Sequence, residues 1–550
     1  MRIRKPSAPT VFFCLLLAAP VSATWMSPLK EGDEVPYDPL HRALVERLEV
    51  ANFEASVPAQ CYTKTGPESN ACWVCHTSGR GENHLVDYDL QAEYAFSDVA
   101  LTNAWENLFV DRTEAIAAIS DEEVLGHVRA DNYTPLRRAL EGHPEHRGWG
   151  PDLDFDAGFD DLGFARDGSG WRALRYQPFP GTFWPTNGST DDVFLRLPEE
   201  FRSRDGQPSL ETYRLNLALL EASIASPDRL SMERVVEPVD EGLCGFDLDG
   251  DGTIGGTITT IRHLPPHFAG DAKSHELLRW LHPQGVEYLH TVRYLDPDAP
   301  GMMARRMKEV RYSKKVQLMD LWGVVYRYER EFKEKEEGNI PMWRGGPDVG
   351  LQNDFGWLLK GYIEDEVGRL RLQTTEEQMA CMGCHSAVGV TVDQTFTLAR
   401  KLPGSAGWAH QNLAGLRDRP QHGHGQPEVL TYLERARGGD EFRANTEMIE
   451  RWFDADGRLR TEEVLRAAPG GDRDLLWLVG PSRERALGLN KAYLALVREQ
   501  RFELGRDTLL GPIENVHRSL TNDTSDLGAA DNIYTDGVLW MDWNWSRADD

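Results

Sequence analysis

Hydrophobic residues recur along much of this chain at three- and four-residue steps, the spacing that places them on one face of an α-helix. A helix that begins at Thr374, with Thr375 and Glu377 in its first turn, is predicted to run into residues 381–385. The remaining predicted helices cover 39–48, parts of 91–142, 210–224, 316–332, 427–437, 447–453, 461–468 and 483–505.

Two segments have a different pattern and predict a smaller β content. Residues 286–294 are rich in β-branched and aromatic residues and predict a strand, and 355–372 predict a hairpin that turns at 364–368. Residues 148–188 are rich in glycine, aspartate and aromatic residues, which indicates an ordered loop. The predicted fold class is therefore mainly α with minor β, in a multi-domain protein.

The first residues have the pattern of an export signal. Arg2, Arg4 and Lys5 precede an apolar segment at 11–19, and Val21-Ser-Ala23 ends in the small residues of a cleavage site. We expect cleavage after Ala23 and a periplasmic location. Cys14 follows two phenylalanines, a poor context for lipid attachment. No later stretch reaches the roughly 18 apolar residues of a membrane span, so no transmembrane segment is expected.

The chain is long and acidic, and both properties limit its organisation and partners. Its 550 residues exceed the usual length of one domain, and we expect boundaries after residues 23, 240 and 345, giving regions 1–23, 24–240, 241–345 and 346–550. The net charge of −28 argues against binding to nucleic acid or anionic lipid. Two readings of it stay open: adaptation to a saline habitat, which is the preferred one, and attraction of a redox partner with a basic surface.

Two short motifs carry the chemistry of the sequence. Cys72-Trp-Val-Cys75-His76 and Cys381-Met-Gly-Cys384-His385 both read C-x-x-C-H, the attachment sequence for c-type haem. Two thiols at this spacing reach both vinyl-derived carbons of one porphyrin, and the adjacent histidine supplies the proximal nitrogen to the iron. We therefore predict two covalently attached c-type haems, with His76 and His385 as proximal ligands.

Two other readings of each cysteine pair remain open, a redox dithiol and half of a zinc site. A zinc site needs four ligands, so the two pairs would have to meet across the long interval between them. The zinc reading also leaves the histidine that follows each pair unexplained.

The paired motifs behind an export signal resemble those of dihaem c-type cytochromes. The chain is also similar in architecture to the bacterial dihaem peroxidase, methylamine-utilisation and rubber-oxygenase group. This resemblance implies periplasmic electron transfer with a redox partner protein, such as a basic cytochrome. The alternative it implies is a haem enzyme, a peroxidase or an oxygenase. It assigns no catalytic residue here.

The sixth ligand of each iron decides between these functions, because a second strong ligand favours electron transfer and an open position permits chemistry. His84 is the histidine nearest to the first motif, and His290 lies on the predicted strand at 286–294. These two are the preferred candidate distal ligands, and the other residues that could serve are His263, His267, His410, His422, His424 and Met307.

Seven cysteines are present, and two of them remain once the motifs and Cys14 are set aside. In an oxidising compartment Cys61 and Cys244 are predicted to form a disulfide. Two unpaired thiols are the alternative.

Residues 247–254 match the start of a calcium-binding loop of the EF-hand type. Asp247, Asp249 and Asp251 supply carboxylates at positions 1, 3 and 5, and Gly252 occupies position 6. Ile258 replaces the glutamate expected at position 12. Calcium bound by the three aspartates is predicted, and a plain acidic turn is the alternative.

Overall fold

The computed structural model describes residues 36–48, 57–65, 69–78, 96, 98–225, 233–337, 343–385, 393, 395–437, 445–521, 527 and 531–546. The predicted signal peptide, Cys14 and His84 lie outside these residues. Residues Pro39–Asp550 group into one compact unit, and the predicted boundaries at 240 and 345 stay predictions.

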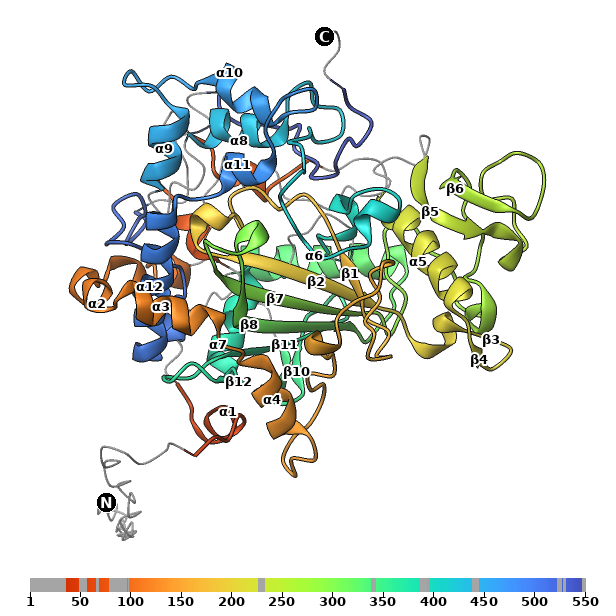
Figure 1. The fold of residues 1–550 in the computed structure, drawn as a ribbon, viewed down its shortest axis with the longest axis horizontal. Coiled ribbons are helices and arrows are strands. Elements are labelled where there is room, and N and C mark those ends of the chain that lie inside the picture. Colours follow the sequence, from red (N-terminus) through yellow and green to blue (C-terminus); the bar gives the residue numbers. More distant parts are fainter. Residues whose placement is uncertain are drawn as a thin grey trace, which may run out of the picture. The chain divides into compact units, whose positions relative to one another are not determined.

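A large antiparallel sheet lies at the centre of this unit (Figure 1). In the described residues it has eight strands. Seven of them run in the order β1 (Arg172–Leu174), β2 (Thr190–Arg196), β7 (Glu287–Leu295), β8 (Met303–Lys315), β11 (Trp357–Glu364), β10 (Gly350–Gln352) and β9 (Arg344–Gly346). The eighth, β12 (Leu370–Leu372), pairs with β11. The prediction of a mainly α fold with minor β is therefore wrong.

The physical reason for this error is the composition of the central strands. β8 carries seven charged residues, which hide the alternation expected of a half-buried strand: Arg305, Arg306, Lys308, Glu309, Arg311, Lys314 and Lys315. Several of these side chains are buried because they form ion pairs inside the fold, such as Arg306 with Glu364. The hydropathy pattern of a strand with buried ion pairs therefore differs from the alternation that identifies strands in a sequence.

The two faces of the sheet have different surroundings. Phe194, Leu289, Val310 and Tyr362, from β2, β7, β8 and β11, belong to one buried hydrophobic cluster. The residues on either side of them in each strand point to the opposite face, and many of those line a cavity. The sheet therefore separates a packed core from the cavity.

Helices pack around this sheet, mostly where their periodicity predicts them. α12 (Arg483–Glu499) contacts α2 (Thr113–Ala118) and α3 (Asp121–Arg129), and α5 (Leu210–Ala225) packs on β5 (Arg234–Asp240), which pairs with β6 (Thr257–Ile261). The other described helices are α1 (His41–Val45), α4 (Tyr133–Leu140), α6 (Leu321–Glu336), α7 (Thr375–Met379), α8 (Glu428–Ala436), α9 (Thr446–Trp452), α10 (Thr461–Val464) and α11 (Leu475–Val479). A short two-stranded pairing joins β3 (Ser203–Arg204) to β4 (Gln207–Pro208).

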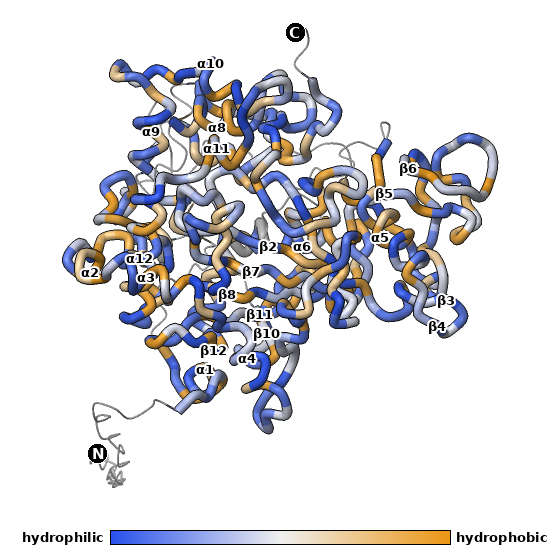
Figure 2. Tube along the Cα trace, in the orientation of Figure 1, coloured by the Kyte–Doolittle hydropathy of each residue, from blue (hydrophilic) through white to orange (hydrophobic). Residues whose placement is uncertain are grey.

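The region after residue 400 forms its own hydrophobic cluster beside the cavity. Leu430 and Leu433 of α8 and Leu475 and Leu478 of α11 are buried in it, and Trp73 of the first motif belongs to the same cluster. Figure 2 shows hydrophobic positions gathered around α8 and α11. The tail docks on the fold, since Trp540 is buried and its indole N–H donates to the carbonyl of Ile224 at 3.1 Å.

Candidate functional site: a cavity shared by two cysteine motifs

One face of the central sheet forms the floor of a cavity of about 470 Å³. That volume lies within the roughly 300–1,000 Å³ range of ligand pockets. Alternate residues of four neighbouring strands form the floor, as a period of two requires. They are Asp191 and Val193 of β2, Tyr288, His290 and Val292 of β7, Glu309, Arg311 and Ser313 of β8, and Trp357, Leu359 and Gly361 of β11.

The two cysteine motifs adopt the same local structure. In the first, the backbone N–H groups of Cys75 and His76 donate to the carbonyl of Cys72 at 3.1 and 2.9 Å. In the second, the N–H groups of Cys384 and His385 donate to the carbonyl of Cys381 at 3.4 and 3.2 Å. The turn places the two thiols of each motif close together, with the histidine directly after them.

Both turns face the same cavity although they are far apart in sequence. Cys75, His76, Cys381, Cys384 and His385 all line it. Burial raises the pKa of the Cys75 thiol, and the nearby Cys384 adds to this effect, so the two motifs approach each other. In the described residues the thiols and imidazoles of the motifs do not bring three ligand atoms within 4.8 Å of one another. That spacing gives the shared-zinc reading no support.

The protonation of the thiols distinguishes between the remaining readings. Burial raises the pKa of the Cys384 thiol to about 11. A redox dithiol instead lowers the pKa of its attacking cysteine, because the thiolate is the reactive form. The exposed surface of Cys384 faces the cavity, and the cavity itself is enclosed by other parts of the protein. These neutral thiols favour a site that holds a ligand over a site of thiol–disulfide exchange.

His385 is held as a neutral imidazole, which is the form that binds metals. Burial lowers its pKa to about 4, and the charges of Arg311 and His290 act in the same direction. The ring of Phe396 packs edge-on against His385, with ring centroids 5.8 Å apart. At neutral pH the histidine of the second motif therefore carries no positive charge, and one of its ring nitrogens is unprotonated.

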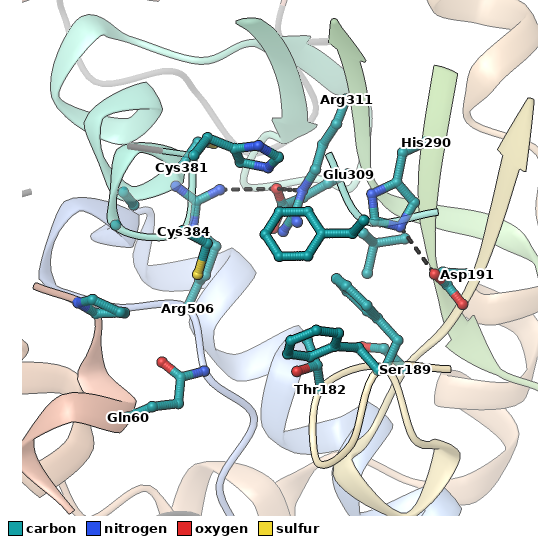
Figure 3. A pocket seen from close by; sticks show the side chains of 18 of the residues that line it. Gln60, Thr182, Ser189, Asp191, His290, Glu309, Arg311, Cys381, Cys384 and Arg506 are labelled. Atoms are coloured by element: carbon teal, nitrogen blue, oxygen red, sulfur yellow. Dashed lines mark hydrogen bonds and ion pairs between the residues drawn. The ribbon is translucent and has the colours of Figure 1, made fainter. Parts of the chain in front are cut away.

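His290 faces the cavity from β7 and is oriented by a buried carboxylate. Its Nε2 lies 3.1 Å from Oδ2 of Asp191, and the hydroxyl of Tyr176 donates to the same oxygen (Figure 3). Phe183 packs edge-on against the imidazole at 4.9 Å between centroids. Histidines that bind metals usually have their second ring nitrogen hydrogen-bonded to a carboxylate or a carbonyl group.

The charge of the cavity is opposite to that of the chain. Four cationic side chains and three anionic ones line it, in a protein that carries −28 overall. The cations are Lys308, Arg311, Arg400 and Arg506, and the anions are Asp191, Glu309 and Asp507. The ammonium of Lys360 instead donates to the carbonyls of Arg147 and Trp149 on the opposite face of the sheet. A cationic cavity in an acidic protein favours an anionic ligand.

Glu309 is held between two of these arginines. Burial would raise its pKa, but the charges of Arg311 and Arg506 outweigh burial and lower the pKa to about 2. Since the folded pKa is below that of the unfolded chain, the pairing stabilises the fold above about pH 4.5 and is lost as the pH falls toward 2. The expected contribution is about 3 kcal/mol at neutral pH.

Replacing Glu309 by glutamine is therefore expected to destabilise the protein more at pH 7 than at pH 3. The reason is that glutamine cannot be protonated and loses the pairing at every pH. Urea unfolding of the wild type and of Glu309→Gln at both pH values measures this. An equal difference at the two pH values would contradict the assigned pairing.

The sequence predicted the motif cysteines and histidines but not the residues around them. His290 lies in the cavity as one of the two preferred distal candidates, and the other, His84, lies outside the described residues. Asp191, Arg311 and Arg506 were missed because nothing in their local sequence distinguishes them. A period-two reading of β7 and β8 would have placed His290 and Arg311 on one face.

The predicted disulfide between Cys61 and Cys244 does not form. Cys61 lines the cavity, whereas Cys244 follows the turn at Glu241–Leu243, and its thiol contacts the carbonyl of Glu241. The disulfide was predicted because these were the two cysteines left over, and the number of cysteines says nothing about the distance between them.

The acidic loop brings together two of its three predicted aspartates. Carboxylate oxygens of Asp247 and Asp249 lie within 4.8 Å of each other and of Glu241, which comes from the preceding turn. Asp251 is not in this group, and it accepts hydrogen bonds from Thr253. Calcium at this loop stays a prediction, with Glu241 as the carboxylate that the missing position 12 requires.

Removing calcium tests the prediction for this loop. If the loop binds calcium, chelation is expected to lower the melting temperature, because an ion that binds only the folded state stabilises it. Asp247→Asn should melt at the lower temperature with or without chelator. Unchanged melting, together with no calcium by elemental analysis, would identify a plain acidic turn.

Comparisons with known proteins place the chain in a family. A family model whose description reads "-like lipoprotein" matches residues 45–470. An "Uncharacterized lipoprotein" of Aquifex aeolicus (strain VF5) is 31% identical over 517 residues, covering 83% of this chain and 86% of the relative. The chain belongs to this lipoprotein family. No solved structure matches it.

The family assignment corrects the resemblance drawn from the motifs. The matching descriptions name a lipoprotein and not a cytochrome, a peroxidase or an oxygenase. The predicted electron-transfer function, its enzymatic alternative and the redox partner implied with them are accordingly not supported. The resemblance rested on two five-residue motifs, whereas the family match covers most of the chain.

The assignment agrees with the predicted export of the chain, because lipoproteins are exported proteins. Within the part of the chain that the structure describes, no helix has the length and apolar character needed to cross a bilayer.

Proposed function

We propose that this protein binds two haem groups covalently, one at each of the two motifs that border the shared cavity. One would be attached at Cys72 and Cys75 with His76 beneath its iron, and the other at Cys381 and Cys384 with His385. The observation that carries the proposal is the convergence of two identical C-x-x-C-H turns on one cavity. If the two motifs had arisen by chance, the fold would not be expected to bring them to the same cavity.

The residues of the cavity fit such a ligand. Neutral thiols are available for thioether bonds, and the neutral imidazole of His385 offers a metal-binding nitrogen. Aromatic and aliphatic side chains suit the apolar porphyrin, and the excess of cations suits its propionate groups. When bound, each haem would supply an iron centre within the cavity.

His290 is proposed as a residue that faces the group attached at the second motif. It is opposite Arg311 in the β7–β8 ladder, and its charge affects His385, so the two imidazoles lie near each other. Asp191 fixes the orientation of the ring through its contact with Nε2. His290 would then be a second residue available to hold the haem at 381–385.

A periplasmic location is part of the proposal. Thioether attachment of haem in bacteria takes place outside the cytoplasmic membrane, which agrees with the predicted export signal. The lipoprotein family favours a lipid anchor in addition to that signal, which differs from the sequence-based expectation that Cys14 is in a poor context for lipid attachment. A partner with a basic surface, expected from the charge of −28, also remains a proposal.

The test uses the exported protein. The purified chain is denatured and extracted with acidified organic solvent, which removes haem that is not covalently bound. We expect the haem absorbance to stay with the polypeptide. Loss of all absorbance into the solvent would contradict covalent attachment, and absence of absorbance before extraction would contradict haem binding.

A further inference from the structure

Among the cationic residues that line the cavity, Arg311 has the most N–H groups available to bind a ligand. It belongs to β8, lies next to His290 across the β7–β8 ladder, and keeps 30% of its side chain exposed. Its Nε donates to Oε2 of Glu309 at 2.9 Å. In the described part of the chain no hydrogen bond is recorded for its two Nη atoms, which leaves that edge of the guanidinium for a ligand.

Glu309 positions the guanidinium of Arg311. Its Oε2 also accepts from Nη1 of Arg506 at 2.9 Å and from Nε2 of Gln373 at 3.3 Å. Arg506 is committed further, because its Nη2 donates to the carbonyl of Glu377. The carboxylate therefore fixes both guanidiniums, and only that of Arg311 offers an unused pair of donors (Figure 3).

The position of Arg311 places these donors beside the second motif. Its charge acts on Cys384 and on His385, and Cys381 acts in turn on Arg311. Phe183 lies 5.7 Å from the guanidinium, measured to the ring centroid. A ligand held at 381–385 would therefore contact a planar cation with two parallel N–H groups.

We propose that the Nη edge of Arg311 binds a carboxylate group of the ligand in the cavity, with Glu309 as the residue that positions it. This inference rests on the proposed haem binding, and the carboxylate would then be a haem propionate. Arginine suits the role because its two Nη donors match a carboxylate bidentately, which a lysine ammonium cannot do.

The test compares two probes that differ only in their carboxylates. The full chain without its signal peptide is produced in a compartment that does not attach haem, and is titrated with hemin and with hemin dimethyl ester. The variants are Arg311→Leu and Arg311→Lys. Arg305→Leu is the matched control, because Arg305 lies on the same strand, is 55% exposed and pairs with Asp156 away from the cavity.

We expect Arg311→Leu to weaken hemin binding by about ten- to a hundredfold, the range for charge-assisted hydrogen bonds, and to leave ester binding unchanged. Arg311→Lys should fall between Arg311→Leu and the wild type, and Arg305→Leu should behave as the wild type. Equal weakening of both probes in Arg311→Leu would overturn the proposal, since it would indicate a structural role. So would unchanged affinity for both.

The two proposals can fail separately. If the exported chain carries no covalent haem but Arg311→Leu still weakens hemin selectively, the carboxylate site stands and the proposed function does not. If covalent haem is present and the variant does not discriminate between hemin and its ester, haem binding stands and Arg311 does not hold a propionate.

Discussion

Replacing Glu237 by glutamine is expected to lower the free energy of unfolding by about 3–5 kcal/mol, because it leaves a buried arginine without its counter-charge. The Arg172 and Glu237 side chains are both 0% exposed, and they form a bidentate pair in which Arg172 Nη2 donates to Glu237 Oε2 at 2.9 Å. Burial already lowers the pKa of Arg172. The pair joins β1 of the central sheet to β5.

Two variants make this prediction specific. Glu233→Gln is the matched control, because Glu233 precedes the same strand but pairs with Arg262 at the surface, with side-chain exposures of 56% and 50%. Its cost should stay below about 1 kcal/mol. The double variant Glu237→Gln with Arg172→Met should recover part of the loss, since the fully buried charge of Arg172 is gone while Arg214, at 22% exposure, still loses its ion pair with Glu237. A single variant as stable as the control in urea unfolding would contradict the assigned pair.

Replacing both cysteines of either motif is expected to remove one haem and leave the other. Cys72→Ala with Cys75→Ala should retain the group at 381–385, and the reverse pair should retain the group at 72–76. The reason is that each thioether needs its own thiol. Haem absorbance per polypeptide should halve in each double variant and vanish when all four cysteines are replaced.

Cys61→Ala is the matched control for the motif variants. Cys61 lines the same cavity but lies outside both motifs. It should keep the full haem absorbance. Equal losses in Cys61→Ala and in a motif variant would show that the cavity, rather than thioether chemistry, holds the cofactor.

Elements with a strong helical period were predictable from sequence, and so were two β elements. α5, α8 and α12 lie where their apolar spacing placed them, and β7 and the β11–β12 hairpin were predicted as well. A capping box at Thr374 and Glu377 starts α7, as the sequence indicated. These features are local, because each depends on residues within a few positions of one another.

The central sheet and the composition of the cavity were not predictable in the same way. β2 contains Asp191 and Asp192, and both are buried because partners from distant strands and loops bond to them, including His290 and His410. A hydropathy pattern scores such residues as exposed. The motifs could be found by their spacing alone, but their convergence depends on pairings between segments that no local pattern encodes.

The mass of the intact, denatured protein purified after export tests the central claim most directly. We predict the mass of the mature polypeptide plus two haem groups, with any lipid anchor identified by its own mass increment. A mature mass that contains no haem would contradict covalent haem binding at Cys72, Cys75, Cys381 and Cys384.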